Sequence, residues 1–233
     1  MKNVAAAIVL CLCLTAPGFA SDTTPPATAA QPTTAPSLSD TRAAAERGDA
    51  AAQNELGLIY KEGRFGVAKD EVEAVAWFRK AAEQGHAEGQ INLAYMYVSG
   101  HGVAQDPAQA VSWMRKAAEQ GAGEAQVGLG LYYQKGQGVA PDAAQAALWY
   151  RKAADQGDAG GELHVGFMYL EGRSVAQDNA EALGWLKKAA GHADGSKWTT
   201  SNRNLARQFI EMIQGNGSIE PTPAPTSAPA PAR

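Results

Sequence analysis

The sequence has very little cysteine, and its two cysteines both lie among the first 13 residues. Residues 1–20 have the pattern of a secretory signal peptide: Lys2 supplies the positive charge, an apolar stretch follows as far as Leu14, and Ala20 ends a small-x-small cleavage pattern. The apolar stretch is shorter than the roughly 20 residues that a membrane-spanning helix needs. Cleavage near Ala20 removes both cysteines, so we expect an exported chain, periplasmic or secreted, that has no disulfide.

The nucleophile motifs of common hydrolases are also missing. The sequence has no Ser-x-x-Lys and no Gly-x-Ser-x-Gly, which are the motifs of serine β-lactamases and α/β-hydrolases. The nearest approach pairs Ser112 with Arg115, and an arginine cannot act as the base. No two of the four histidines are three or four residues apart, so we expect no metal site and exposed or rim positions for all of them: His86, His101, His164 and His192. We therefore expect no catalytic residue and no cofactor.

Neither basic nor acidic residues are in large excess. Twenty Lys and Arg stand against 24 Asp and Glu, which gives a formal net charge of −4. This mildly acidic balance argues against nucleic acid and against an anionic membrane surface as main partners. Large apolar residues are scarce in two segments rich in Pro, Ala and Thr, 21–38 and 215–233, and we expect both to be disordered because they cannot bury enough surface to fold.

What the sequence does contain is a repeat of 36 residues. Four tryptophans recur at this interval, and so do four aspartates, four alanines and four lysines: Trp77, Trp113, Trp149, Trp185; Asp70, Asp106, Asp142, Asp178; Ala74, Ala110, Ala146, Ala182; Lys80, Lys116, Lys152, Lys188. Four copies in strict phase predict a repeat array in which each copy packs on its neighbours.

Each copy is predicted to form two helices. In the first copy Ala52, Leu56 and Tyr60 share one face of a helix over 50–62, and a glycine ends this helix. The second helix begins at the repeated aspartate, which we expect to form a capping box with a Glu or Gln three residues later. The repeated tryptophans lie on its buried stripe, so we expect all four in the core. The repeated lysines suit the negative end of the helix dipole.

The array is expected to be capped at both ends. A short helix with Ser39 as its N-cap forms a half-repeat over 39–48. Four full repeats follow over about 49–190, and a helix of different pattern, over about 202–214, covers the last apolar face. Residues 39–214 are thus predicted to be one solenoid domain.

The repeated pattern A-x-x-x-L-G-x-x-Y-x-x-G-x-G-V-x-x-D-x-x-x-A-x-x-W-x-x-K-A-A-x-x-G resembles the Sel-like repeat family, a relative of tetratricopeptide repeats. The third copy carries it throughout, at Ala125, Leu129, Gly130, Tyr133, Gly136, Gly138, Val139, Asp142, Ala146, Trp149, Lys152, Ala153, Ala154 and Gly157. The resemblance covers about residues 41–195. It implies an all-α fold, a right-handed α/α solenoid of helix-turn-helix repeats. It also implies a non-catalytic adaptor or scaffold that binds other proteins or peptides.

The first helices of such arrays line the concave side, where their outward positions form the predicted binding groove. Nine of the twelve positions are apolar: Asn54, Leu58, Lys61, Ile91, Tyr95, Val98, Val127, Leu131, Gln134, Leu163, Phe167 and Leu170. The alternative is that neighbouring first helices bury this stripe. Two other functions stay open, a hydrolase of cell-wall or β-lactam substrates like that described for cysteine-rich relatives, and a purely structural spacer. We expect a monomer.

Overall fold

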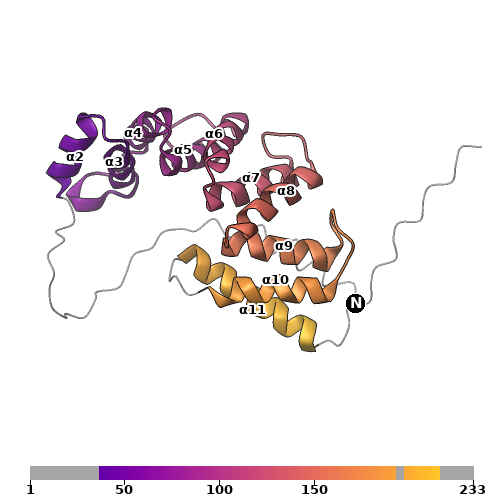
Figure 1. Ribbon diagram of the computed structural model, residues 1–233. Coiled ribbons are helices and arrows are strands. Elements are labelled where there is room, and N and C mark those ends of the chain that lie inside the picture. Colours follow the sequence, from indigo (N-terminus) through magenta and orange to yellow (C-terminus); the bar gives the residue numbers. More distant parts are fainter. Residues whose placement is uncertain (1–36, 193–196, 216–233) are drawn as a thin grey trace, which may run out of the picture. The chain divides into compact units, whose positions relative to one another are not determined.

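The structure is a computed structural model that describes residues 37–192 and 197–215 (Figure 1). The predicted signal peptide, the predicted linker as far as residue 36 and the predicted tail beyond Gly215 lie outside these residues. Within the described ranges the chain forms helices and no strand. The helices are α2 (Leu38–Glu46), α3 (Ala50–Glu62), η1 (Arg64–Gly66), α4 (Glu71–Glu83), α5 (Ala87–Ser99), α6 (Pro107–Glu119), α7 (Gly123–Lys135), α8 (Ala143–Asp155), α9 (Ala159–Glu171), α10 (Asn179–Gly191) and α11 (Lys197–Gly215).

The helices pack on one another in their order along the chain (Figure 1). The first helices of the four copies, here called A helices, are α3, α5, α7 and α9, and the second helices, here called B helices, are α4, α6, α8 and α10. Each A helix packs against the B helix of its own copy, and α5, α7 and α9 also pack against the preceding B helix. At the two ends, α2 packs on α3 and α11 packs on α10 and α9. The prediction of an all-α solenoid of helix-turn-helix repeats is confirmed.

Small residues on the A helices let the B helices approach closely. A Cβ atom on Gly57 would lie 2.6 Å from the ring of Phe78, and one on Gly130 would lie 2.5 Å from the ring of Tyr150. Both rings are buried. A methyl group does not fit at such distances without displacing the ring. The glycine beside the repeated Leu therefore lets the two helices of these copies approach closely.

The loops between the A and B helices use glycine where one copy touches the next. Gly102 and Gly138 have φ values of 67° and 72°, and a Cβ atom on either would lie 2.1 Å from a main-chain oxygen of the preceding copy. In the fourth copy Ser174 takes this place with a φ of 61°, and its hydroxyl donates to the carbonyl oxygen of Ala143 at 3.0 Å. The loops thus lie directly on the first turns of the preceding B helices.

The repeated aspartates begin the B helices, but without the expected capping box. Asp70 Oδ1 accepts hydrogen bonds from the N–H groups of Val72 and Glu73, both at 3.0 Å, and the other three aspartates do the same. The reciprocal bond does not form because the N–H of Asp70 donates to the carbonyl oxygen of Tyr60 at 2.9 Å. The Glu73 carboxylate accepts instead from Nε1 of Trp77 at 3.0 Å. The N-cap prediction is right, and the capping-box prediction is wrong.

The first and the last helix of the array both begin at an earlier residue than expected. Ser37, and not Ser39, is the N-cap of α2, because Asp40 stands three residues after it and completes a capping box. The predicted linker therefore ends before Ser37. At the other end, α11 begins at Lys197 and not near Asn202. Between Trp198 and Leu205 this helix carries only polar residues, so the sequence pattern marks its first turns weakly.

The four repeated tryptophans are not equally buried. Trp77 and Trp149 are 8% and 6% exposed, whereas Trp113 and Trp185 are only partly buried against the core. The expectation that all four lie in the core is wrong for these two. In every copy the Nζ atom of the lysine three residues later lies 3.6–4.0 Å from the ring centroid, so a cation covers one face of each ring.

Candidate functional site

The structure buries half of the twelve predicted binding positions. Six are buried: Asn54, Ile91, Val127, Leu163, Phe167 and Leu170. Five are half-buried: Leu58, Lys61, Val98, Leu131 and Gln134. Tyr95 is exposed, at 39%. The expected continuous exposed stripe is therefore not present, because neighbouring helices cover most of it. A binding role for these residues stays a prediction.

The three predicted positions on α9 are buried at the C-terminal end of the array. Helix α11 packs against both α9 and α10. The ring of Phe209 on α11 meets the ring of Phe167 edge-on, with centroids 4.6 Å apart. Leu163, Phe167 and Leu170 are 2–6% exposed. In this structure they are core residues, and they do not form an open groove.

A hollow lies on the A-helix side between α5 and α7, over α6. Its volume is about 110 Å3, and two predicted site residues are among its lining residues: Tyr95, Met114, Glu124, Gly128, Leu131, Tyr132, Lys135 and Gln137. Gly128 leaves room for the Met114 side chain below it, since a Cβ atom there would lie 3.1 Å from Met114 Sδ. The other copies have larger side chains at this position, Glu55, Asn92 and His164. The signal in the sequence that could have revealed the hollow was thus a glycine at a position where the other three copies carry a larger side chain.

Polar groups line the rim of the hollow. The hydroxyl of Tyr95 donates to Oε1 of Glu124 at 2.9 Å. Although the Tyr95 side chain is exposed, desolvation of its hydroxyl group and the negative charge of Glu124 raise the pKa of Tyr95, so the hydroxyl stays protonated and remains a donor. Burial also raises the pKa of Tyr132 to about 12. Lys135 and Gln137 complete the lining, so an apolar space is bordered by one acidic and one basic side chain.

Side-chain hydrogen bonds join the A helices of the first two copies. The Nδ2 atom of Asn54 donates to Oε2 of Glu88 at 3.3 Å, and its Oδ1 atom accepts from Nδ2 of Asn92 at 2.8 Å. Glu88 takes the same place on α5 that Glu124 takes on α7. Asn54 is buried and bonded through both polar atoms, so in this structure it links α3 to α5.

A second set of polar contacts repeats where one copy meets the next. On the first three A helices a buried glutamine donates to a carbonyl oxygen of the preceding helix and accepts from a glutamine that follows its own B helix. The amide groups lie 2.6–2.8 Å apart in the pairs Gln53–Gln84, Gln90–Gln120 and Gln126–Gln156. In the fourth copy the equivalent pair is Glu162 and His192, with Oε2 and Nε2 2.8 Å apart.

The histidines are not all exposed or at the rim. His164 is buried and stacks on Tyr150 with ring centroids 4.4 Å apart. Burial lowers the pKa of His164 to about 4, so the ring is neutral near pH 7. The prediction was wrong for this residue because its surroundings come from another copy. His86 is the N-cap of α5, where its Nδ1 atom accepts the N–H of Gly89 at 3.2 Å. His101 is exposed.

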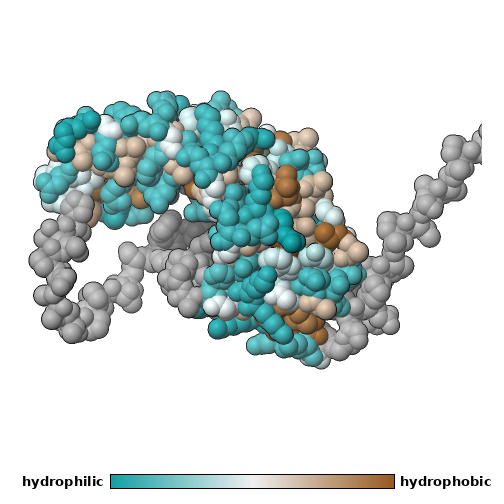
Figure 2. Space-filling view, in the orientation of Figure 1, coloured by the Kyte–Doolittle hydropathy of each residue, from teal (hydrophilic) through white to brown (hydrophobic). Residues whose placement is uncertain are grey.

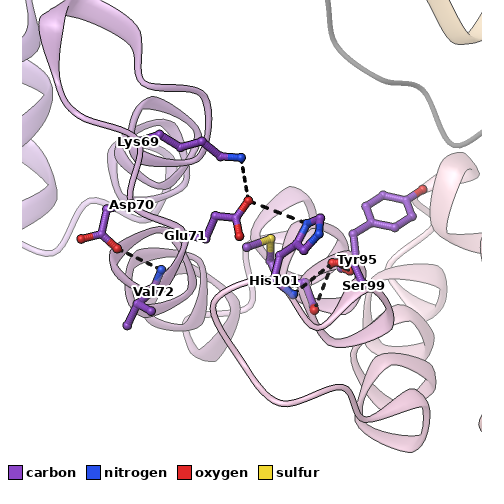
Figure 3. A network of polar contacts seen from close by, with 8 residues as sticks. Lys69, Asp70, Glu71, Val72, Tyr95, Ser99 and His101 are labelled. Carbon is purple, nitrogen blue, oxygen red and sulfur yellow. Dashed lines mark hydrogen bonds and ion pairs between the residues drawn. The ribbon is translucent and has the colours of Figure 1, made fainter.

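Ionic contacts connect the first copy to the loop of the second (Figure 3). Lys69 Nζ lies 2.8 Å from Glu71 Oε1, and His101 Nδ1 lies 3.8 Å from the same oxygen. The hydrogen bond from Lys69 holds the pKa of Glu71 below its usual value. In Figure 3 the ring of Tyr95 points away from these groups. Ion pairs at the surface of this kind contribute little free energy.

Other features that would indicate a chemical site are not seen in the described part of the chain. Over residues 37–192 and 197–215, no group of three or more His, Cys, Asp and Glu side chains could hold a metal ion. None of the helices described here is both long and apolar enough to cross a membrane. On the face drawn in Figure 2, hydrophilic residues predominate and apolar residues form small scattered groups.

Comparison with known proteins places the chain in a family. Four segments match the Sel1 repeat, at residues 50–86, 87–121, 123–158 and 160–194. No curated protein matches the chain. Among solved structures, it is 37% identical to a protective antigen of uropathogenic Escherichia coli strains that displays an SLR fold. The TM-score is 0.65, and the match covers 78% of this chain and 41% of that one, so the chain spans less than half of that protein.

A second similar structure is a Sel1 repeat protein from Oxalobacter formigenes. The two chains are 34% identical, with a TM-score of 0.67, and the match covers 79% of this chain and 70% of that one. The repeat segments found by the family comparison coincide with the helix pairs described above. The chain belongs to the Sel1 repeat family.

Proposed function

We propose that this protein is a non-catalytic adaptor that binds another protein or a peptide at the hollow between α5 and α7. The Sel1 repeat family supports protein interaction as the general class of function. The observation that carries the proposal is an exposed tyrosine, Tyr95, at the edge of an apolar space of about 110 Å3. Tyrosine is enriched at the energetically important centres of protein interfaces, because its ring is apolar and its tip is polar.

The lining residues favour a partner segment of particular chemistry. Met114 and Leu131 offer apolar contact for one inserted side chain of the partner. Glu124 and Lys135 border the same space, so an apolar side chain with a basic and an acidic residue close to it would match both charges. The hydrolase alternative has no support from the family match or from the described residues.

We also propose that the protein is exported, on the basis of the signal-like residues 1–20. The test is the mass of the protein recovered from its own cells, after separation of cytoplasm, envelope and medium. A chain that begins near Ser21 in the envelope or the medium supports export. A full-length chain confined to the cytoplasm contradicts it.

The binding proposal is tested by photo-crosslinking from a defined position. A photo-reactive phenylalanine analogue replaces Tyr95 in one variant and Leu148, which is 47% exposed on α8, in a matched control. Circular dichroism first checks that both variants are folded. Irradiation in the native cell envelope is expected to give a crosslinked protein from position 95 and not from position 148.

A further substitution separates the hollow from the rest of the surface. Leu131→Arg places a charge in the apolar space and is expected to abolish the crosslink from position 95. A crosslink that persists in a folded Leu131→Arg variant would show that the partner does not use the hollow. No crosslink from either position would contradict the adaptor function and favour the structural spacer.

A further inference from the structure

The loop that follows α3 carries an exposed aromatic side chain on a backbone conformation that rarely holds one. The Phe65 residue of η1 is 61% exposed, with φ 55° and ψ 30° in the left-handed region. Large side chains are uncommon in this region. The loop is one residue longer than the corresponding loops of the other three copies. Neither backbone preference nor burial in the core accounts for a phenylalanine here, so its ring is accessible to another molecule.

Charged side chains lie beside the Phe65 ring. The guanidinium carbon of Arg64 is 5.8 Å from the ring centroid. Arg64 Nη2 lies 2.7 Å from Glu55 Oε1, and Arg64 Nε lies 2.9 Å from Glu62 Oε2. Two carboxylates thus share one guanidinium, and these three side chains together carry a net negative charge. A molecule that binds the ring therefore meets one cation and an excess of anionic groups.

The hollow between α5 and α7 suits an aromatic side chain. Its lining includes the Tyr132 ring and Met114, and thioether sulfur atoms make favourable contacts with aromatic rings. The volume of the hollow is about 110 Å3. A closed apolar cavity of about 150 Å3 holds a benzene molecule. Because the hollow opens to solvent, a phenyl ring can enter it without being wholly enclosed.

The rim of the hollow complements the charges beside Phe65. Lys135 is exposed at the end of α7. Its ammonium group can pair with a carboxylate of an incoming Phe65 loop, while Glu124 can attract the guanidinium group of Arg64. The hollow and the loop therefore match in shape, in aromatic character and in the signs of their charges.

Phe65 is also distinct among the exposed large apolar side chains of the described residues. The others are Val72, Tyr95 and Leu148. Val72 and Leu148 are aliphatic and lie on helices, whereas Tyr95 lines the hollow itself. Among these four, Phe65 alone combines an aromatic ring outside the hollow with a position in a loop.

We propose that Phe65 of one molecule inserts into the hollow between α5 and α7 of a second copy of this chain. This inference rests on the proposed binding role of the hollow and names its partner. The ring and the hollow are different surfaces of one molecule, so the contact is heterologous and builds a head-to-tail chain or a closed ring. One inserted side chain buries little surface, so the association is weak. The protein is then a monomer when dilute and associates where its local concentration is high.

Sedimentation equilibrium of the purified full chain, at concentrations up to about 1 mM, tests the association because dissociation constants into the millimolar range are then detected. The weight-average mass of the parent protein is expected to rise with concentration. Phe65→Ala should weaken the association at least about tenfold, as loss of a central interface side chain does. The matched control is Val72→Ala, which removes another exposed apolar side chain, 67% exposed, and should associate like the parent.

A mixture of two variants tests the head-to-tail arrangement. Leu131→Arg blocks the hollow and keeps Phe65, whereas Phe65→Ala keeps the hollow. Each variant alone is expected to stay monomeric, and the equimolar mixture is expected to form dimers and nothing larger, because one ring and one hollow remain for each pair. Circular dichroism checks that both variants are folded. If Leu131→Arg is unfolded, Lys135→Glu takes its place, since it reverses an exposed charge at the rim.

Three outcomes would overturn the proposal. They are a parent protein whose mass does not rise up to about 1 mM, a Phe65→Ala variant that associates like the parent, and a mixture that stays monomeric although the parent associates. A monomeric parent together with a crosslink from position 95 to a different protein in the cell envelope would overturn this inference and leave the adaptor function standing. A monomeric parent without any such crosslink would contradict both.

Discussion

At the scale of single residues, the junction of the A and B helices in the first, third and fourth copies depends on a glycine that leaves room for a large side chain. A Cβ atom on Gly130 would lie 2.5 Å from the Tyr150 ring, whereas one on Gly184 of α10 would meet nothing within 4 Å. We expect Gly130→Ala to destabilise the protein by about 1–3 kcal/mol through overpacking. Gly184→Ala should stabilise it by about 0.5–1 kcal/mol, since alanine favours the helix. Urea unfolding measures both, and equal stabilities would contradict this account of the packing.

A second effect of a single residue concerns acid stability. Burial lowers the pKa of His164 to about 4, against about 6.5 for a free histidine, so the folded state favours the neutral ring. The stability that this residue contributes is complete above pH 6.5 and is lost as the pH falls towards 4. The 2.5-unit difference corresponds to about 3 kcal/mol at most.

The test replaces His164 with an aromatic residue that cannot be protonated. His164→Phe keeps an aromatic ring beside Tyr150, so we expect its unfolding free energy to fall less between pH 6.5 and pH 4 than that of the parent protein. Both proteins contain the same carboxylates, whose titration therefore cancels in the comparison. Parallel loss of stability in the two proteins would show that His164 does not resist protonation.

At the scale of elements, α11 is expected to act as the C-terminal cap. Its Phe209 and Ile213 are buried, and Phe209 contacts Phe167. Deletion of residues 197–233 should expose these contacts on α9 and α10 and cause aggregation, because a repeat array needs a polar end. The control is deletion of 216–233 alone, which we expect to leave the melting temperature unchanged. A truncated protein without α11 that stays monomeric in light scattering would refute the cap assignment.

The elements also show how far the sequence could predict the fold. The first A helix was predicted at 50–62 and forms at Ala50–Glu62, because a glycine in the left-handed region ends it immediately. The capping box failed because Tyr60, from the preceding helix, takes the N–H of Asp70. The burial of His164 was missed for a related reason, since Tyr150 comes from another copy. Local signals were thus readable in the sequence, and contacts between helices or copies were not.

The candidate site was less predictable than the fold. The periodicity correctly identified which residues lie on the A helices, but burial depends on what the neighbouring helices carry. Phe167 was assigned to a groove, and it is buried against Phe209 of α11. To predict the hollow from the sequence, one would have to notice that Gly128 has no side chain. The effect of this glycine depends on a contact between helices, because Met114 of α6 lies below it. A repeat therefore predicts common positions well and the differences between copies poorly.

At the scale of the whole molecule, each copy touches mainly its neighbours, so the array should tolerate the loss of one copy in phase. Deletion of residues 87–122 joins His86 to Gly123 and brings Gln126 to the position of Gln90, where it can donate to the Ala82 carbonyl oxygen. We expect a folded protein with unchanged helical content per residue and a lower melting temperature, as nearest-neighbour stability predicts.

The matched control is a second deletion that does not remove a whole repeat, so the remaining copies no longer follow one another in phase. Loss of residues 87–106 removes α5 and its loop only, so that two B helices, α4 and α6, follow one another without an A helix between them. We expect this variant to lose cooperative unfolding in circular dichroism, although it lacks fewer residues. Equal behaviour of the two deletions would contradict a modular array. The in-phase deletion also removes Tyr95 and Met114, and with them the hollow. This deletion should therefore abolish the binding of the partner protein while the solenoid remains folded. Such a result would separate the binding site from the scaffold that carries it.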